Sequence, residues 1–558
     1  MKNKIFSVIA VATLLTSATS CIREIEPQSN YATAEQVANA PGAFDNAVNA
    51  INTTMCGRFP LQNNSSYPRD MGIPSLILQR DVMGQDIVYP YLNWFSAQYG
   101  CQYLGPSYIY CQFPWSYYYQ WIKSCNEVIT MAGSDPADNL KGGAGVAYAY
   151  RAMCYMDLAR LFAKEPYTVN KEAETVPLVL ETTAIADLAN NPRATNEVMW
   201  AQIISDLDKA EEYLPHYNRV DKTMPDLSVA KGLKARAYLE MGDWANAQRY
   251  AKEAQEGYTV MTEAEYTDWE TGFNTPNNSW MWCLQYKADD PAILENDADT
   301  SWGSMMCMEI NPTVSGCGYA ANYGQPFLID RHLYETIPAT DCRKKCYVDF
   351  AIDDLGSDAE KVEALNAYSK HGDWLLNAGK NTQGYEKVGG IELKFRTAGG
   401  DVGRDNQYIG FVVAVPLMRV EEMCLIEAEA AGRQNETEGI RLLTEFAKKR
   451  DANFTYGQHG QEAYYNTTSG QFVNEVWWQR RVELWGEGFA TFDIKRLQKG
   501  IIRSYPGTNH VDGYQWNQET TPAWMNFCIV QTETNYNTAC TNNLDPIAPV
   551  GNSAPYNF

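Results

Sequence analysis

Most of the chain shows the apolar periodicity of α-helices. In seven segments, apolar residues recur every three to four positions, the spacing that places one apolar stripe along a helix. These segments cover residues 34–52, 116–131, 144–163, 196–214, 228–258, 417–433 and 436–450. We therefore predict a mostly helical protein.

One segment predicts a helical hairpin of the tetratricopeptide-repeat type. Residues 235–254 read ARAYLEMGDWANAQRYAKEA, with Gly242 and Asp243 at the expected turn. Small residues on both sides of the turn let two helices approach closely, namely Ala237, Ala247, Ala251 and Ala254. Weaker partial copies fall at 144–175 and 417–450, and repeats of this type need stacked neighbours to bury their faces.

Three stretches lack this periodicity and are predicted to be long loops. They cover residues 259–330, 340–415 and 501–558, and are rich in Gly, Asn, Pro, Asp and Thr. Long ordered loops on a regular scaffold often carry functional residues. We therefore expect the functional site in these stretches.

A run near the C-terminus, residues 477–500, joins an apolar helix to a charged segment. It reads WWQRRVELWGEGFATFDIKRLQKG, and its first part is apolar on most sides of a helix that ends at Gly486. Charged residues that lie among apolar neighbours need partners. We predict a buried ion-pair network, rather than acid–base machinery, that includes Glu483, Glu487, Asp493 and Arg496.

This run resembles the C-terminal signature of the SusD-like (RagB/SusD) family, surface glycan-binding lipoproteins of Bacteroidetes, whose usual form is close to ERRxELxxEGxRxxDxxR. Gln479 stands where the family usually has Glu, and Ala490 where it usually has Arg. Other stretches match the family in its usual order, at 76–90, 115–129, 191–215 and 416–432. The resemblance implies a mostly α, SusD-like fold with a tetratricopeptide-repeat-like helical scaffold and a loop-rich irregular half.

The chain contains no Pro-, Gly- or Ser-rich linker, so we expect one composite domain after the signal peptide. We divide it into an N-terminal SusD-like region at 21–260, with the repeat-like helices, and a C-terminal RagB/SusD region at 261–558. The second region is loop-rich, with helices around 417–450 and 472–487.

The N-terminus predicts export and lipid attachment. Lys2 and Lys4 precede an apolar stretch at 5–15 that is too short to span a bilayer. Small residues then lead to Cys21, so residues 1–20 are predicted to be a signal peptide and Cys21 the lipidated first residue. Glu24 and Glu26 follow closely, which is similar to the acidic export signal of surface lipoproteins. We expect a lipid-anchored outer-membrane protein that faces the cell exterior.

The composition narrows the classes of partner and cofactor. A formal net charge of −23, without a basic patch, argues against binding to nucleic acid or anionic lipid. The cysteines are scattered; Cys101 with Cys111, or Cys342 with Cys346, could pair, but most are expected to be buried small apolar residues. The five histidines have no metal-ligand spacing. We predict neither a metal nor a cofactor.

Aromatic residues are concentrated in one early window, residues 89–121, where they make up fourteen of 33 positions against 12% of the whole chain. Tyr118 and Trp121 lie on a helical stripe and are expected in the core. Several of the others lie among Pro, Gly, Asn and Gln without helical period. Exposed Trp and Tyr rings can cover the C–H face of a sugar while neighbouring amides bind its hydroxyls.

A second aromatic set follows the repeat, at Trp269, Trp280, Trp282, Trp302, Tyr319 and Tyr323. In the family, the glycan site is a shallow arc of aromatic side chains from an early loop and from the irregular half. The resemblance therefore implies ligand-binding residues in both windows of this chain. They are Arg80, Tyr91, Asn93, Trp94, Tyr99, Trp280, Trp302, Tyr319 and Tyr323.

The function implied is non-catalytic capture of an oligosaccharide and its delivery to a SusC-like TonB-dependent outer-membrane transporter. Other functions also fit the residues: a secreted glycoside hydrolase on a helical scaffold, a peptide-binding member of the same family, or a periplasmic solute-binding lipoprotein. The sequence has no catalytic motif, but two carboxylates that meet only in space would leave none.

Overall fold

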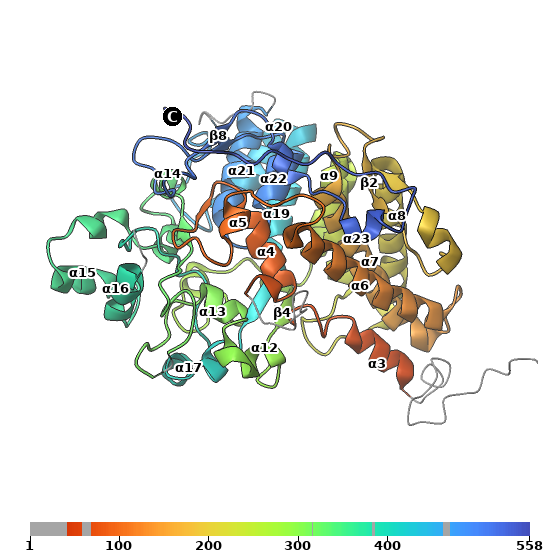
Figure 1. The fold of residues 1–558 in the computed structure, drawn as a ribbon, viewed down its shortest axis with the longest axis horizontal. Helices are drawn as coiled ribbons and strands as arrows, with labels where there is room; N and C mark the ends of the chain where they lie inside the picture. Colours follow the sequence, from red (N-terminus) through yellow and green to blue (C-terminus); the bar gives the residue numbers. More distant parts are fainter. Residues whose placement is uncertain (1–41, 58–67, 315, 382–384, 461–468) are drawn as a thin grey trace, which may run out of the picture. The chain divides into compact units, whose positions relative to one another are not determined.

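Long antiparallel helices form one half of the molecule (Figure 1). A computed structural model describes residues 42–57, 68–314, 316–381, 385–460 and 469–558, and residues 47–558 form one compact unit. Five of its helices pack in chain order, each against the next. They are α6 (Ile109–Ala132), α7 (Asp138–Phe162), α8 (Asn196–Tyr213), α9 (Leu227–Met241) and α10 (Trp244–Ala254). The prediction of a mostly helical scaffold is confirmed.

The predicted helical hairpin is present as α9 and α10. Gly242 ends α9 in the left-handed conformation, at φ 70°, and the Asp243 side chain accepts a hydrogen bond from the Asn246 N–H to start α10. The small residues Ala237, Ala247, Ala251 and Ala254 are fully buried between the packed helices. Close helix approach therefore explains the small side chains.

The two weaker repeat copies have different outcomes. In the later one, α19 (Val420–Gln434) and α20 (Glu436–Ala447) form a helix pair, and α10 packs against α19. This extends the array with a segment remote in sequence. The earlier copy, at 144–175, has one helix only, because α7 ends at Phe162 and the chain continues through turns into a strand. That prediction is wrong, and α7 packs instead against α6 and α8.

The stretches predicted as loops contain short helices and strands. Their helices are α11 (Glu263–Tyr266), α12 (Pro291–Leu294), α13 (Trp302–Met306), α14 (Arg331–Thr336), α15 (Asp358–Leu365), α16 (Gly372–Asn381), α17 (Gly400–Arg404), α18 (Gln407–Gly410) and α23 (Gln531–Thr534). Earlier in the chain lie α3 (Ala43–Ala50), α4 (Ile73–Val82) and α5 (Ser96–Tyr99). None of these helices exceeds three turns, so most of this half is held by side-chain contacts rather than by regular structure.

Eight short strands form four antiparallel pairs in the described residues. The pairs are β1 (Ile87–Val88) with β5 (Leu328–Ile329), β2 (Glu174–Pro177) with β3 (Arg193–Thr195), β4 (Trp280–Gln285) with β6 (Ala414–Arg419), and β7 (Ile501–Ile502) with β8 (Asn517–Gln518). β4 contradicts the prediction of a loop at 259–330. Its first five residues, WMWCL, are a short continuous apolar run, a pattern typical of a strand buried on both faces.

The C-terminal signature begins with the predicted buried helix, α21 (Gln471–Glu483), and its charged segment forms a further short helix, α22 (Ala490–Arg496). Gly486 and Gly488 lie between them in the left-handed conformation, at φ 75° and 85°. Trp477 and Trp478 are almost wholly buried, as is Trp485 just beyond the helix. The run is therefore part of the core.

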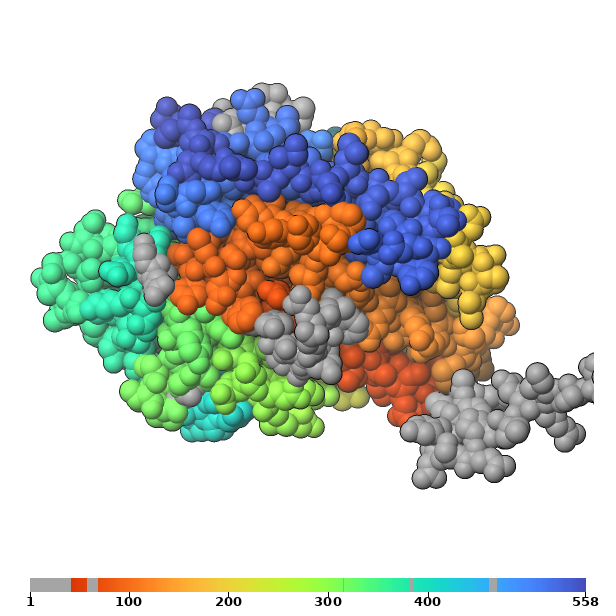
Figure 2. Space-filling view, viewed as in Figure 1, coloured from red at the N-terminus to blue at the C-terminus, as the bar shows by residue number. Residues whose placement is uncertain are grey.

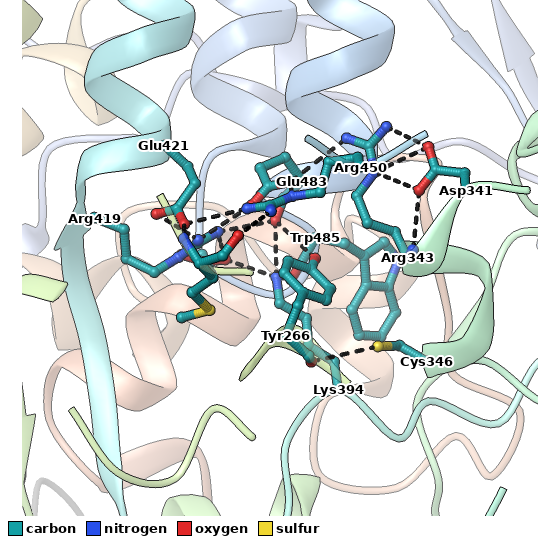
Figure 3. Close-up of polar contacts among 12 residues, drawn as sticks. Tyr266, Asp341, Arg343, Cys346, Lys394, Arg419, Glu421, Arg450, Glu483 and Trp485 are labelled. Atoms are coloured by element: carbon teal, nitrogen blue, oxygen red, sulfur yellow. Dashed lines mark hydrogen bonds and ion pairs between the residues drawn. The ribbon is translucent and has the colours of Figure 1, made fainter. Parts of the chain in front are cut away.

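The charges around α21 form the predicted ion-pair network (Figure 3). The Arg419 guanidinium lies 2.9 Å from Glu421, 3.1 Å from Glu483 and 2.8 Å from Glu487. Arg450 donates to Glu483 at 2.8 Å and lies 3.1 Å from Glu421. Each charge is thus shared among several partners, which is what burial of ions requires.

The network has two further parts. Lys394 Nζ lies 2.6 Å from a Glu487 oxygen. In the second part, Arg496 of α22 pairs with Glu429 at 2.6 Å and with Asp493 at 3.0 Å. Burial alone would raise the pKa of Glu483, but the neighbouring Arg450 and Arg419 hold it well below its usual range. Glu483 is therefore a permanent anion, not a proton donor.

The two positions that depart from the signature, Gln479 and Ala490, lie beside polar groups of this core. Gln479 is fully buried, and neither atom of its amide has a hydrogen-bond partner among the described residues. At Ala490 the buried carboxylate of Asp81 accepts backbone N–H bonds, from Gly488 at 2.8 Å and from Ala490 at 3.1 Å. Burial raises the pKa of Asp81 to about 7 against these donors.

All thirteen cysteines in the described residues are free thiols, so neither suggested pair forms a disulfide. Twelve are buried and Cys424 is partly exposed, which confirms that most act as small apolar residues. Cys21 and the predicted signal peptide lie outside the residues that the structure describes. Among the residues described, no helix is both long enough and apolar enough to cross a membrane.

Candidate functional site

A single strand pair brings the two aromatic windows together. β1 pairs antiparallel with β5, with Ile87 opposite Ile329 and Val88 opposite Leu328. The chain that leaves β1 therefore runs beside the chain that enters β5. Directly beyond the pair, the rings of Tyr89 and Phe327 stack at 4.8 Å. Loop 89–95 and loop 316–327, far apart in sequence, are fixed side by side.

Three of the predicted ligand-binding rings meet where these loops continue. Trp94 and Tyr319 have ring centroids 5.8 Å apart in an edge-to-face arrangement, and Tyr319 and Tyr323 have centroids 5.4 Å apart. We call Trp94, Tyr319 and Tyr323 the aromatic cluster. Tyr323 is 44% exposed, and the other two are partly exposed. The cluster thus presents ring surface to solvent on a supported base.

Buried polar groups hold the Tyr319 segment in place. The Ser304 hydroxyl, on α13, accepts the Tyr319 N–H at 3.0 Å and donates to Asp299 at 3.2 Å. Asp299 also accepts the Gly318 N–H at 2.9 Å. Burial nevertheless raises the pKa of Asp299 to about 6, and burial together with Asp299 raises the pKa of Tyr319 to about 12. The Tyr319 hydroxyl is therefore neutral at physiological pH.

Backbone strain is concentrated around the same loops. Nine non-glycine residues described in the structure have positive φ, a conformation that side chains disfavour. Three of them lie at 92, 101 and 103, and three more at 296–298, just before Asp299. Such conformations persist only where the surroundings fix them, and they tend to occur at functional sites. Leu92 lies on the Trp94 loop, and residues 296–298 lead into Asp299, which accepts the Gly318 N–H.

The side chains around the cluster include two predicted residues, Tyr91 and Asn93, and one that was not predicted from the sequence, Arg69. Asn93 is exposed and Tyr91 partly exposed, both on the Trp94 loop. The Arg69 guanidinium carbon lies 5.8 Å from the Trp94 ring centroid and 5.9 Å from that of Tyr110. Arg69 carries no sequence signal of its own, because only the fold places residue 69 beside residue 94.

Tyr99 does not belong to the exposed surface. It is fully buried, its hydroxyl is hydrogen-bonded to His510 Nδ1 at 2.7 Å, and its ring stacks on Tyr514 at 5.3 Å. The prediction that it contacts a ligand is incompatible with this burial. Tyr99 instead anchors its loop to the C-terminal segment.

Trp280 and Trp302 are also core residues, with 0% and 1% of their surface exposed. Trp280 begins β4, directly opposite Arg419 of β6. Trp302 begins α13 and packs edge to face on Phe395 at 5.1 Å. Neither ring has a free face on which a sugar can stack, so both are removed from the candidate site.

Arg80 is buried on α4 and serves the core. It lies 2.9 Å from Asp157 and donates to the Tyr118 hydroxyl at 3.3 Å. Tyr118 and Trp121 are buried as predicted. With its charge compensated inside the protein, Arg80 is placed to connect α4, α6 and α7 and not to bind a ligand at the surface.

The described residues contain no group of three or more His, Cys, Asp or Glu side chains arranged to hold a metal ion. In the acidic loop at 349–358, the carboxylates bind within the protein. Asp349 accepts the Tyr334 hydroxyl at 2.7 Å, and Asp353 accepts the Val388 N–H at 2.8 Å. These acids therefore fix local structure.

The chemistry available at the candidate site is that of stacking and hydrogen bonding. The cluster offers ring faces, Asn93 an exposed amide, and Asp297 an exposed carboxylate that accepts the Tyr408 hydroxyl at 3.3 Å. Such groups match a ligand with apolar C–H faces and many hydroxyls.

Comparison with known proteins agrees with the fold and extends across most of the chain. A family model described as "Starch-binding associating with outer membrane" matches residues 80–239, and a model described as "SusD family" matches residues 315–550. The chain is 24% identical over 403 residues to the SusD-like protein P2 of Formosa agariphila, a match that covers 69% of this chain and 71% of the relative.

Solved structures show the same fold. A SusD-like carbohydrate-binding protein from Bacteroides vulgatus superposes with a TM-score of 0.66 at 21% identity, covering 89% of this chain and 97% of that one. A SusD superfamily protein from Bacteroides thetaiotaomicron gives 0.65 at 18% identity, covering 90% and 99%. These structures show the fold alone, and the two family models, which together match more than half of the chain, show that it belongs to the SusD/RagB family.

Proposed function

We propose that this protein is a non-catalytic glycan-binding protein of the cell surface that captures an oligosaccharide at the aromatic cluster. The observation that carries the proposal is the meeting of Trp94, Tyr319 and Tyr323 from two remote loops, with ring surface exposed. Stacking on such rings, with hydroxyls bound by Asn93 and neighbouring groups, accounts for sugar recognition without chemistry. The carbohydrate-binding relative of the same fold supports it.

The proposal includes anchoring and delivery. Cys21 carries the lipid, the protein faces the cell exterior at the outer membrane, and the captured glycan passes to a SusC-like TonB-dependent transporter. The family description "associating with outer membrane" supports this location. Isolation in mild detergent should recover the transporter with the protein, and protease treatment of intact cells should digest it. Isolation without any barrel protein, or full protection from the protease, would contradict delivery or exposure respectively.

Binding at the cluster is tested by removing one ring. In Trp94→Ala, we expect the affinity for the polysaccharide that the parent binds to fall about tenfold, as loss of a stacking surface predicts. Affinity electrophoresis against a panel of polysaccharides, followed by calorimetry, measures it. Trp374→Ala is the matched control, because Trp374 of α16 is also partly exposed but stacks on His371, outside the site loops. Unchanged affinity in Trp94→Ala would remove the cluster from the proposal.

A glycoside hydrolase is the second candidate, favoured by one observation. Asp299, next to the cluster, has a pKa of about 6 and can hold a proton near neutral pH, as a general acid must. Against this, both donors described above bind its Oδ1 atom from within the protein. Chromatography of oligosaccharides after incubation decides: unchanged chains support a binder, and shortened chains lost in Asp299→Asn support an enzyme.

A further inference from the structure

Two tyrosines outside the aromatic cluster form a second exposed ring pair. The rings of Tyr103 and Tyr108 lie 5.2 Å apart, inclined at 54°, and the residues are 53% and 45% exposed. Neither phenol is hydrogen-bonded to another described residue. Tyr110, two positions further on, belongs to a different group, because it lies under Arg69 beside Trp94. The pair is thus a separate surface feature.

The loop that carries this pair is rigidly attached. The Gln102 N–H donates to the Ala97 carbonyl at 2.8 Å, and the Cys111 thiol to the Leu104 carbonyl at 3.0 Å. Gln531, from the C-terminal segment, donates its N–H to the Pro106 carbonyl at 2.9 Å. The rings are therefore held at fixed positions while their faces remain in water.

Holding Tyr103 there requires an unfavourable backbone. Its φ is 57°, and that of Cys101, two residues earlier, is 49°. Bulky side chains rarely adopt this conformation, and it persists only when the surroundings impose it. Glycine or a small polar residue would adopt this backbone at a lower cost in free energy. The presence of an exposed tyrosine there indicates that the ring itself has a function.

A carboxylate lies beside the pair. A Cβ atom built on Gly105 would be 3.2 Å from Asp545 Oδ1 and 3.4 Å from the Tyr108 ring, so these groups crowd the same glycine. Asp545 is exposed and accepts the Cys528 thiol at 3.1 Å. Figure 2 shows the orange surface of the early chain bordering the dark-blue C-terminal segment on one face of the molecule. Ring faces and a carboxylate acceptor are the groups that bind a sugar unit.

We propose that Tyr103, Tyr108 and Asp545 form a second glycan-contacting platform, which binds a further part of a long carbohydrate chain whose first part occupies the aromatic cluster. The inference rests on the proposed function and deepens it: the ligand is a polymer or a long oligosaccharide, not a small sugar. Two platforms on one chain raise the effective concentration of the second contact, so affinity grows with ligand length.

The same face offers one competing interpretation, a protein-docking surface. The C-terminal segment that contains Asp545 also has three exposed aliphatic residues. The exposed fractions of Leu544, Ile547 and Val550 are 89%, 85% and 93%. Aliphatic side chains suit a protein partner better than a sugar. Tyr103, however, is held on this face in a strained backbone, and the chemistry of the tyrosine pair is that of a sugar platform.

The test combines Tyr103→Asn, which tolerates the left-handed backbone, with Tyr108→Ala in one variant. The control is Tyr536→Ala, since Tyr536 is 78% exposed without a ring partner among the described residues. Calorimetry against the polysaccharide that the parent binds, and against its short and long oligosaccharides, is the measurement. We expect about a tenfold loss for long chains and less than about a twofold change for the shortest. Trp94→Ala should weaken both.

The possible results distinguish failure of the second platform from failure of the proposed function. Equal affinity of the double variant and the parent at every length overturns the platform but leaves the proposed function intact. Unchanged glycan binding with loss of a co-purifying membrane protein also overturns it and assigns the face to protein docking. A parent that binds no polysaccharide overturns both proposals. If the double variant unfolds at a lower temperature than the parent, Asp545→Asn alone repeats the measurement.

Discussion

The ion-pair network around α21 and the aromatic cluster differ in burial: the first is enclosed in the core, and the second is partly exposed to solvent. Around α21, Glu483 is fully buried and paired with Arg419 and Arg450. Its carboxylate therefore stabilises the fold and is not accessible to a ligand. At the cluster, the rings are supported from below but keep exposed surface. The charged residues of the C-terminal signature, Glu483, Glu487 and Arg496, belong to the first region, whereas the second consists mainly of ring surfaces.

This contrast shows that residue type is a poor guide to function without burial. Trp280 and Trp94 are both tryptophans in aromatic-rich windows, yet Trp280 is buried in the core and Trp94 is partly exposed. Likewise Arg80 compensates Asp157 inside the protein, whereas Arg69 lies at the candidate site. The following changes test the contrast, from the largest expected effect to the smallest.

Glu483→Gln should destabilise the protein most. The change leaves Arg419 and Arg450 buried without one of their shared anions, which should lower the free energy of unfolding by about 3–5 kcal/mol. Urea unfolding followed by circular dichroism measures it. Glu335→Gln is the control, because its 2.7 Å pair with Arg331 is exposed and should contribute less than about 1 kcal/mol. Similar losses in both variants would contradict the distinction between the two regions.

Trp280→Ala should lower stability without changing ligand affinity. Removing a fully buried indole from β4 leaves a cavity, and the expected loss is about 3–5 kcal/mol in the free energy of unfolding. Trp94→Ala should show the reverse, a small loss of stability and a large loss of affinity. Calorimetry on the folded variants at low temperature separates the two effects. A Trp280→Ala protein with parental stability and lost affinity would place Trp280 in the site after all.

Asp299 should make stability depend on pH near the cluster. Burial raises its pKa in the folded state to about 6, from the usual aspartate value of 3.8. A raised pKa means that the contribution of this group is fully present below about pH 4 and is lost as pH rises through about 6. Relative to Asp299→Asn, the parent should therefore lose on the order of 1–3 kcal/mol across this window. Unfolding curves at several pH values measure the difference; a flat difference would contradict the shift.

Gln479→Met should stabilise the protein by about 1 kcal/mol. The buried amide of Gln479 has no partner among the described residues, and an apolar side chain of similar shape removes that penalty. Gln85→Met is the matched control and should destabilise, because the equally buried Gln85 accepts the Ile502 N–H at 2.8 Å. Destabilisation in both variants would mean that the Gln479 amide is satisfied in solution.

The sequence predicts the helical half well, because helix formation and burial there follow a local period. The turn at Gly242 and the buried helix before Gly486 both depend on neighbours within a few positions. The prediction of a loop at 259–330 overlooks β4, although the signal of this strand is local: Trp280 to Leu284 are five apolar residues in succession.

The candidate site is predicted only in part, because its members meet through tertiary contacts. Trp94, Tyr319 and Tyr323 are correctly placed together by the resemblance to the family, and their contact with a ligand stays a prediction. Tyr99 and Trp302 share the same composition of neighbours but are buried by His510 and Phe395, residues remote in sequence. The boundary between regions at residue 260 also stays a prediction.

The pairing of β1 with β5 has a consequence for how specificity can change. Two residues in each strand hold loops 89–95 and 316–327 together, while the ion pairs that stabilise the scaffold lie elsewhere. The sequences of the two loops can therefore change while the strand pair that positions them stays the same. Transfer of both loops from a relative, with Ile87–Val88 and Leu328–Ile329 retained, should transplant the relative's ligand preference into an unaltered frame.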